Sequence, residues 1–195
     1  VIKVSVEKPT LTGTYTYNGT NQTATLNKFD QATMNVSGNT GIDAGDYTAI
    51  ISLKDSENYQ WSDGTVTELT LDWKINTKSI EAVWGITTTF VYNGEAQAPT
   101  VKASSGVSGE MLNLTRTTEV EVGDYTSQAK IESVTGGRAK VSNYTLTNDT
   151  KEFHITNAKI TGSVTITGKN QYGSTLTAET IVNPEDATLS YQWYS

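Results

Sequence analysis

Apolar residues alternate with polar residues along much of the chain. Two stretches of the first half show this most clearly: Tyr47, Ala49, Ile51 and Leu53, and then Leu69, Leu71, Trp73 and Ile75. A third stretch, in the second half, has the same pattern at Tyr125, Ala129 and Ile131. A period of two places these side chains on one face of a strand, so the pattern predicts sheets with one buried face and one wet face.

Composition supports strands and disfavours helices. Of the 195 residues, 34 are Thr, about one in six, and β-branched residues favour a pleated, half-exposed surface. No window of ten or more residues has a helical period, so we expect a chain that is nearly all strand. Four Trp, ten Tyr and three Phe can anchor several small cores, which argues against disorder.

A run of short motifs occurs twice in the same order. Tyr17-Asn18-Gly19 with Gln22 returns 75 residues later as Tyr92-Asn93-Gly94 with Gln97. Three further matches follow, at offsets of 78 to 85 residues: Gly45-Asp46-Tyr47-Thr48 with Gly123-Asp124-Tyr125-Thr126, Asn58-Tyr59 with Asn143-Tyr144, and Trp73-Lys74-Ile75 with Phe153-His154-Ile155. The order of the motifs is the same in both copies, while the distance between matching motifs varies by a few residues. This indicates two homologous units whose loops differ in length.

The repeat predicts the domain organisation. We expect a first β module at residues 1–76, a second at 77–156, and in residues 157–195 the start of a third Ig-like module that is incomplete. The segments that link them, 75–78 and 155–158, contain neither Gly nor Pro, which favours a direct passage from strand to strand and an elongated, semi-rigid rod. Each Asn-Gly pair predicts a hairpin with a type I′ turn.

Each module is expected to be a small β-sandwich whose aromatic core closes without disulfides. A β-grasp-like module, with a short helix or an irregular crossover at residues 28–39, is the alternative. Both are all-β or nearly so, and the sequence leaves the choice between them open.

The repeated motifs resemble those of known repeat modules. Tyr-Asn-Gly-x-x-Gln, Ala-Gly-Asp-Tyr-Thr, Asn-Tyr-x-Trp and a closing Trp-Lys-Ile are similar to the bacterial Ig-like and MBG/YDG-type tandem repeats of Gram-positive cell-surface proteins. The resemblance covers residues 1–156 and weakens in the second copy, where Val122, Leu146 and His154 replace Ala, Trp and Lys. It implies a stalk or adhesive spacer at the cell surface or in the cell wall, and it carries over no catalytic residue.

Charge and reactive residues exclude several classes of function. Fourteen basic against 21 acidic residues give a net charge of −7, which disfavours nucleic acid because phosphates need clustered Lys and Arg. No Cys is present, so thiolate metal sites, disulfides and Cys nucleophiles are excluded. No apolar run approaches the roughly 20 residues that span a bilayer. The first residues do not resemble an export signal, so we expect any such signal or anchor to lie outside this segment.

Few residues are candidates for a site, and each has a structural interpretation that we prefer. His154, the only His, is expected on the wet face of its strand, where a catalytic base would need positioned partners. An acidic stretch lacks the spacing of a calcium loop and is interpreted as solvated; it comprises Asp43, Asp46, Asp55, Glu57 and Asp63. No catalytic, cofactor-binding or metal-binding residue is therefore assigned.

The aromatic residues are interpreted as core rather than as a platform for sugar stacking. This applies to Tyr59, Trp61 and Trp73, whereas Trp84 and Tyr172 are less patterned and are candidates for exposure. The Asn-x-Ser/Thr sequences are attributed to composition; they begin at Asn18, Asn21, Asn35, Asn113, Asn143 and Asn148. A Lys–Asn isopeptide crosslink would need a buried Lys, an Asn and an acid together.

These observations favour a non-catalytic, monomeric stalk or adhesion segment of an extracellular bacterial surface protein. A module that binds a glycan or a host protein is the alternative, and it predicts an exposed aromatic cluster or apolar patch. A glycoside hydrolase is the least favoured reading, because it needs a cleft in which two carboxylates stand about 5 to 10 Å apart.

Overall fold

The computed structural model describes residues 2–137, 140–183, 187–192 and 194. Strands make up nearly all of its regular structure, as the alternation predicts. The helical element of the described residues is one short 3₁₀ turn, η1 (Val141–Asn143). Residues 28–39 are all described and consist of turns and one strand, so the helix of the β-grasp alternative does not form there.

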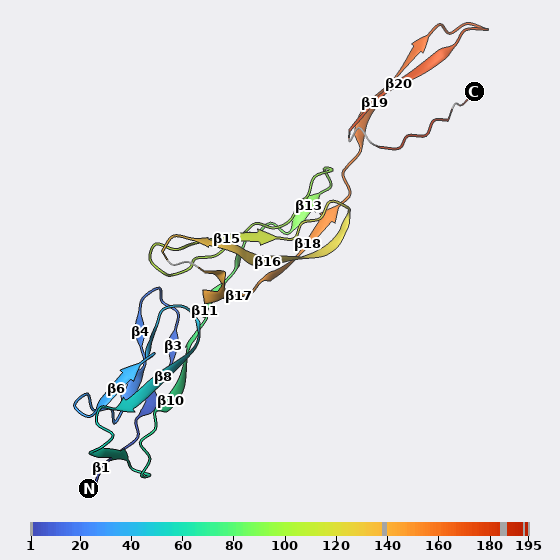
Figure 1. The fold of residues 1–195 in the computed structure, drawn as a ribbon. Coiled ribbons are helices and arrows are strands. Elements are labelled where there is room, and N and C mark those ends of the chain that lie inside the picture. The colour runs from blue at the N-terminus through green and yellow to red at the C-terminus, as the bar shows by residue number, and fades with distance from the viewer. Residues whose placement is uncertain (1, 138–139, 184–186, 193, 195) are drawn as a thin grey trace. The chain divides into compact units, whose positions relative to one another are not determined.

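The strands fall into three groups along the chain (Figure 1). The first repeat contains β1 (Val4–Val6), β2 (Thr10–Thr12), β3 (Tyr15–Thr16), β4 (Gln22–Thr23), β5 (Thr25–Asn27), β6 (Met34–Ser37), β7 (Thr40–Gly41), β8 (Gly45–Leu53), β9 (Tyr59–Trp61) and β10 (Leu69–Asn76). The second contains β11 (Lys78–Glu81), β12 (Val83–Trp84), β13 (Thr89–Val91), β14 (Val101–Lys102), β15 (Met111–Arg116), β16 (Gly123–Thr135), β17 (Tyr144–Thr147) and β18 (Thr150–Thr156). The last group is β19 (Thr161–Gly168) and β20 (Leu176–Asn183).

The chain forms two compact units. Unit 1 comprises residues 1–84, 101–116 and 128–149, and unit 2 comprises residues 85–100, 117–127 and 150–195. Unit 1 therefore contains the whole first repeat together with three segments of the second. One residue, Thr77, separates β10 from β11, so the direct strand-to-strand link expected between the repeats is confirmed.

The largest sheet of unit 1 has the strand order β3-β10-β8-β6. β8 and β10 pair antiparallel over seven positions, with Tyr47 opposite Trp73, and β6 adds antiparallel to β8. β3 lies on the other side of β10 and runs parallel to it, with Tyr15 opposite Ile75. A second parallel pair joins β1 to β9, with Val4 opposite Tyr59.

Strand pairings of the first repeat recur in the second. β11 pairs parallel with β17 as β1 does with β9, and β13 pairs parallel with β18 as β3 does with β10. The antiparallel pairs β2–β5 and β6–β8 have counterparts in β12–β14 and β15–β16. The short pair β4–β7, which starts at Gln22, corresponds to a single bridge between Gln97 and Glu119. The sequence repeat is thus also a repeat of hydrogen-bonded register.

The predicted apolar faces are buried. Ala49 and Ile51 of β8 and Ile75 of β10 are fully enclosed, and the intervening Asp46, Thr48 and Lys74 are exposed. Trp61 packs with Met34, Ile51 and Leu53 in one cluster of unit 1, and Phe153 packs with Ala98 and Ile155 in a cluster of unit 2. The assignment of Tyr59, Trp61 and Trp73 to the core is confirmed, although Tyr59 is only half-buried.

A further cluster of unit 1 takes members from both repeats. Tyr17, Trp73 and Ile75 from the first repeat pack with Ile80 and Tyr144 from the second. The Tyr17 and Tyr144 rings meet edge to face, with centroids 5.3 Å apart. The sequence predicts a separate core in each repeat. Instead, Tyr17, near the start of the first repeat, and Tyr144, near the end of the second, pack in the same core cluster.

The Asn-Gly pairs do not form the predicted type I′ hairpins. Only the glycines take positive φ, 78° at Gly19 and 77° at Gly94, whereas a type I′ turn needs it at both central residues. The Asn18 side chain accepts a hydrogen bond from the backbone N–H of Thr20, and the Asn93 side chain accepts one from that of Glu95. This local Asx geometry turns the chain, and β3 then pairs with β10 and not with β4.

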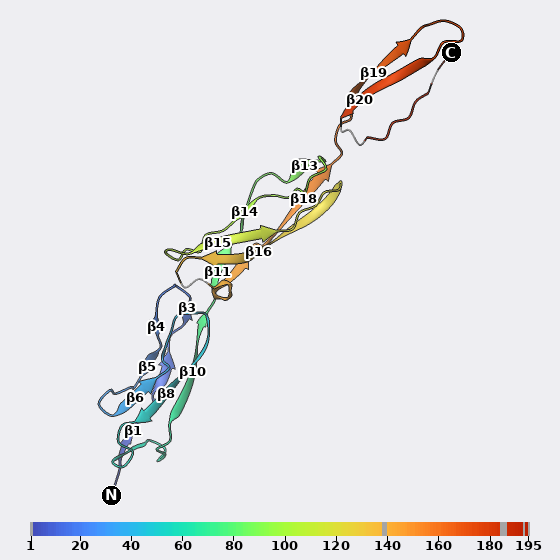
Figure 2. The same cartoon turned by 45° about the horizontal axis from the view of Figure 1, so that its top comes forward.

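The described part of residues 157–195 contains one antiparallel hairpin, β19–β20, which Figure 2 shows in orange to red. Its register puts Val164, Ile166 and Ala178 on one face and the Thr-rich positions on the other. Tyr191 is hydrogen-bonded through its hydroxyl to Thr180. Residues 187–192, which follow β20 in the described part of the chain, are not in a strand, and Trp193 lies outside the described residues.

Candidate functional site

A polar groove lies over β8 and β10 in unit 1. Its cavity has a volume of about 670 Å³ and is lined by Asp46, Tyr47, Thr48, Asp72, Trp73 and Lys74. The antiparallel register sets these residues as three cross-strand pairs. Because side chains alternate along each strand, the central aromatic pair faces the core while the two flanking polar pairs face solvent.

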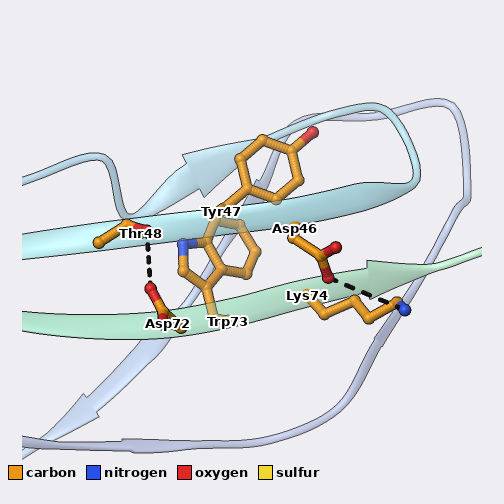
Figure 3. Close-up of a pocket in the computed structure, with 6 residues that line it drawn as sticks. All are labelled: Asp46, Tyr47, Thr48, Asp72, Trp73 and Lys74. Carbon is orange, nitrogen blue, oxygen red and sulfur yellow. Dashed lines mark hydrogen bonds and ion pairs between the residues drawn. The ribbon is translucent and has the colours of Figure 1, made fainter.

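The three pairs interact directly (Figure 3). The Tyr47 and Trp73 rings are stacked, with centroids 4.7 Å apart and planes 26° from parallel. Thr48 donates a hydrogen bond of 2.7 Å to Asp72, and Lys74 Nζ lies 3.8 Å from Asp46 Oδ1. The indole N–H of Trp73 donates to the carbonyl of Gly38. The aromatic pair therefore stabilises the fold. The polar groups that line the groove are the ammonium of Lys74, the carboxylates of Asp46 and Asp72, and the hydroxyl of Thr48.

The second repeat has an equivalent groove in unit 2. Its cavity of about 340 Å³ is lined by Asp124, Tyr125, Thr126, Glu152 and His154, and Tyr125 stands 5.6 Å from Phe153 between ring centroids. His154 takes the place of Lys74 and contacts Asp124 through Nδ1. Both side chains are largely exposed, which confirms that His154 lies on the wet face of its strand.

A buried carboxylate that sequence reasoning missed lies in unit 1. Glu110 is 7% exposed and accepts hydrogen bonds from the hydroxyls of Tyr17 at 2.6 Å and Tyr144 at 2.5 Å. Burial, and then the hydrogen bond to Glu110, raise the pKa of Tyr17 to about 12. The same two causes raise the pKa of Tyr144 above its usual value of 10. Both tyrosines are thus held as neutral donors to the carboxylate.

A second polar cluster of unit 1 surrounds Asn143, which is fully buried. Its Oδ1 accepts a hydrogen bond of 2.8 Å from the backbone N–H of Ala44, and its Nδ2 donates one of 3.0 Å to Asp43. Lys140 is ion-paired with the same carboxylate at 2.5 Å. The amide of this Asn-x-Thr sequence is therefore engaged within the fold. A Lys, an Asn and an acid do come together here, but Lys140 is 59% exposed and lacks the burial that an isopeptide crosslink needs.

The acidic stretch is distributed over several local contacts. Asp63 is paired with Lys8 at 2.6 Å and accepts from Thr65, and these bonds hold the pKa of its carboxyl well below the usual range. Asp55 accepts from Asn58, which lowers the pKa of that carboxyl too. Across the described ranges, no three His, Asp or Glu side chains are grouped closely enough to hold a metal ion.

The two aromatic residues singled out as candidates for exposure differ from each other. Tyr172 is fully exposed. Trp84 is half-buried, and its indole N–H donates to the carbonyl of Asn148 at 2.8 Å. An exposed stacking platform is therefore not built from Trp84, Trp61 or Trp73.

Comparison with known proteins adds no identification. No family model matches the chain, and neither a curated protein nor a solved structure matches it. Among the residues that the structure describes, no helix is long and apolar enough to cross a membrane.

Proposed function

We propose that this chain is a non-catalytic spacer: a stalk or adhesion segment of an extracellular bacterial surface protein, built from tandem β modules. The observation that carries the proposal is the packed junction between the two repeats inside unit 1. There the link is one residue long, and side chains from both repeats share one core cluster. A junction of this kind holds one repeat in a fixed position relative to the next, and a spacer requires this.

The junction has both apolar and polar components. Tyr17 packs on Tyr144, and Glu110 accepts a hydrogen bond from each hydroxyl. Separately, the Asn143 side chain ties the Asp43–Ala44 segment of the first repeat to the second. Buried polar groups satisfied from both sides favour one arrangement over others, because a shift would leave them unpaired.

The resemblance of the repeated motifs to bacterial Ig-like and MBG/YDG-type modules supports the same role, as do the acidity of the chain and its lack of Cys. In this proposal the Tyr-Asn-Gly-x-x-Gln motif is structural. Gln22 Nε2 donates to the carbonyl of Thr16 at 3.1 Å, and Gln97 Nε2 donates to that of Val91 at 3.0 Å. In each repeat, the Gln side chain of the motif is thus hydrogen-bonded to the backbone of the preceding strand.

Small-angle scattering of residues 1–195 tests the spacer role. A compact chain of 195 residues has a radius of gyration of about 16 Å. A spacer of tandem modules is expected to exceed that value clearly and to give a rod-like distance distribution, whereas a value near 16 Å would contradict the proposal. Antibody labelling of intact source cells tests localisation. A signal that is seen only after the cells are lysed would contradict a surface location.

The recurrent groove favours a second candidate function, the binding of an extracellular glycan. Both repeats present an Asp, a Thr, an acid and a cationic or ionisable residue at matching positions, and such groups can hydrogen-bond sugar hydroxyls. A glycan array probed with the wild type and with Asp72→Asn and Glu152→Gln checks this. Signals unaffected by both substitutions would exclude the grooves as the binding site.

A further inference from the structure

Four parallel strand pairings join the beginning of each repeat to its end. In the first repeat β1 pairs with β9 and β3 with β10; in the second, β11 pairs with β17 and β13 with β18. We propose that these pairings form a mechanical clamp, so that each repeat resists tension applied along the chain. The use of the clamp under tension rests on the proposed spacer function.

The clamp of the first repeat contains more than its ladder bonds. The backbone N–H of Val4 donates to Asn58, and that of Tyr17 donates to Asn76. Asn76 also donates through Nδ2 to the carbonyl of Tyr15 at 3.0 Å. Residues 4–17 are thereby fastened at both ends to residues 58–76, which close the repeat.

The second repeat has two of these bonds in sequence-equivalent places and a further one of its own. The backbone N–H of Tyr92 donates to Thr156, as that of Tyr17 does to Asn76. Thr156 donates through Oγ1 to the carbonyl of Phe90 at 3.0 Å, in the position that Asn76 takes against Tyr15. Near the other parallel pair, Asn148 donates to the carbonyl of Ala82 at 3.0 Å. Asn76 and Thr156 thus make equivalent bonds with different side chains.

Strand direction determines how tension acts on these bonds. When the chain is pulled from its ends, β3 is drawn toward its N-terminus and β10 toward its C-terminus. Since the two strands run parallel, the forces on them are opposed along the strand axes, and all hydrogen bonds of the pair are loaded at once. Antiparallel strands at these positions would be pulled from the same end, and their bonds would break one after another.

Single-molecule force spectroscopy tests the proposal on the whole chain. The protein has no native Cys, so pairs of introduced Cys residues can serve as attachment points. Thr14→Cys with Thr77→Cys loads β3 and β10 in shear. Thr14→Cys with Lys74→Cys places both handles at the same end of the paired segment and unzips it. All three residues are exposed, and the two attachment pairs differ only in the second attachment point, which is Thr77 just after β10 in one pair and Lys74 within β10 in the other.

We expect unfolding at a fixed force to be at least about tenfold slower for the 14/77 pair than for the 14/74 pair. Tenfold corresponds to about 1.4 kcal/mol, the order of one net hydrogen bond, and shear breaks several together. In the 14/77 geometry, Asn76→Ala should raise the unfolding rate about tenfold, whereas Thr70→Ala, at an exposed position of the same strand, should change it little. Equal rates for the two geometries, or equal effects of the two substitutions, would overturn the clamp.

Failure of the clamp and failure of the spacer role give different results. Isotropic resistance in a chain that is extended in solution and present at the cell surface would overturn the clamp alone. Anisotropic resistance in a chain that is compact in solution would overturn the spacer role and leave the clamp as a property of the fold.

Discussion

The hydroxyl of Tyr17 donates a hydrogen bond of 2.6 Å to Oε1 of Glu110, which lies 93 residues further along the chain. The other carboxylate oxygen accepts a bond from Tyr144, whose ring meets that of Tyr17 edge to face. One acid thus ties the Tyr-Asn-Gly motif of the first repeat to the Asn-Tyr motif of the second. The repeated motifs serve the junction as well as their own repeats.

Replacing Glu110 tests the contribution of this acid. Glu110→Gln keeps the shape but removes the charge and one acceptor, so both tyrosine hydroxyls lose a charge-assisted bond and one of them faces an NH₂ group that cannot accept. We expect a loss of about 1 to 3 kcal/mol in the free energy of unfolding, measured by chemical denaturation. Glu132→Gln, at an exposed position of β16, is the control and should be nearly neutral. Equal effects of the two substitutions would show that the buried acid adds nothing.

The raised pKa of Tyr17 predicts sensitivity to alkaline pH. Its pKa of about 12 in the folded chain exceeds the ordinary value of 10, so the folded state retains a proton that the unfolded state loses. The stabilisation is complete below pH 10 and is lost as the pH rises from 10 to 12. Denaturation curves across this range should show a smaller loss of stability in Tyr17→Phe than in the wild type. Parallel losses in the two proteins would contradict the assignment.

The two Asn-Tyr motifs offer a matched pair. Asn143 is buried and bonded to Asp43 and Ala44, whereas its counterpart Asn58 is exposed and bonded to Asp55. Asn143→Ala should cost about 2 to 3 kcal/mol, because it removes a fully buried side chain and leaves the part-buried backbone N–H of Ala44 without its acceptor. Asn58→Ala should cost less than about 1 kcal/mol. The reverse order in thermal or chemical unfolding would be inconsistent with a packed junction.

Two glycines differ in what surrounds them. A Cβ at Gly38 would stand 2.2 Å from the carbonyl oxygen of Thr48, whereas one at Gly64 would meet nothing within 4 Å; both residues have positive φ. Gly64→Ala should cost about 1 kcal/mol for the backbone conformation alone. Gly38→Ala should cost clearly more, because the backbone of β8 must also shift. Denaturant midpoints of the two variants check this order.

The sequence predicted the local part of the fold well. Alternation from Tyr47 to Leu53 identifies the buried face of β8 because side-chain direction in a strand depends only on position parity. The expected type I′ turn at Asn18-Gly19 was wrong, since the Asn18 side chain bonds to the backbone of Thr20 and holds the turn in another form. Whether Asn18 forms this bond depends on its side-chain rotamer, which turn propensities do not specify.

The non-local features could not be predicted from one sequence. The parallel pairing of Tyr15 with Ile75 depends on which strands meet, and alternation is the same for either direction. Glu110 follows a glycine-rich break and resembles any solvated loop acid. Its two tyrosine partners, Tyr17 and Tyr144, lie 93 and 34 residues away along the chain. The recurrence of motifs was visible, but their meeting at a junction was not.

The packed junction is tested most directly by spin-label distances within unit 1. Thr70→Cys on β10 and Lys102→Cys on β14 place labels at exposed positions of the two repeats. Double electron–electron resonance should give a single narrow distance distribution in the otherwise native chain, and a broader one when Glu110→Ala is added. A broad distribution without that substitution would contradict the account, because it would mean that the repeats move independently.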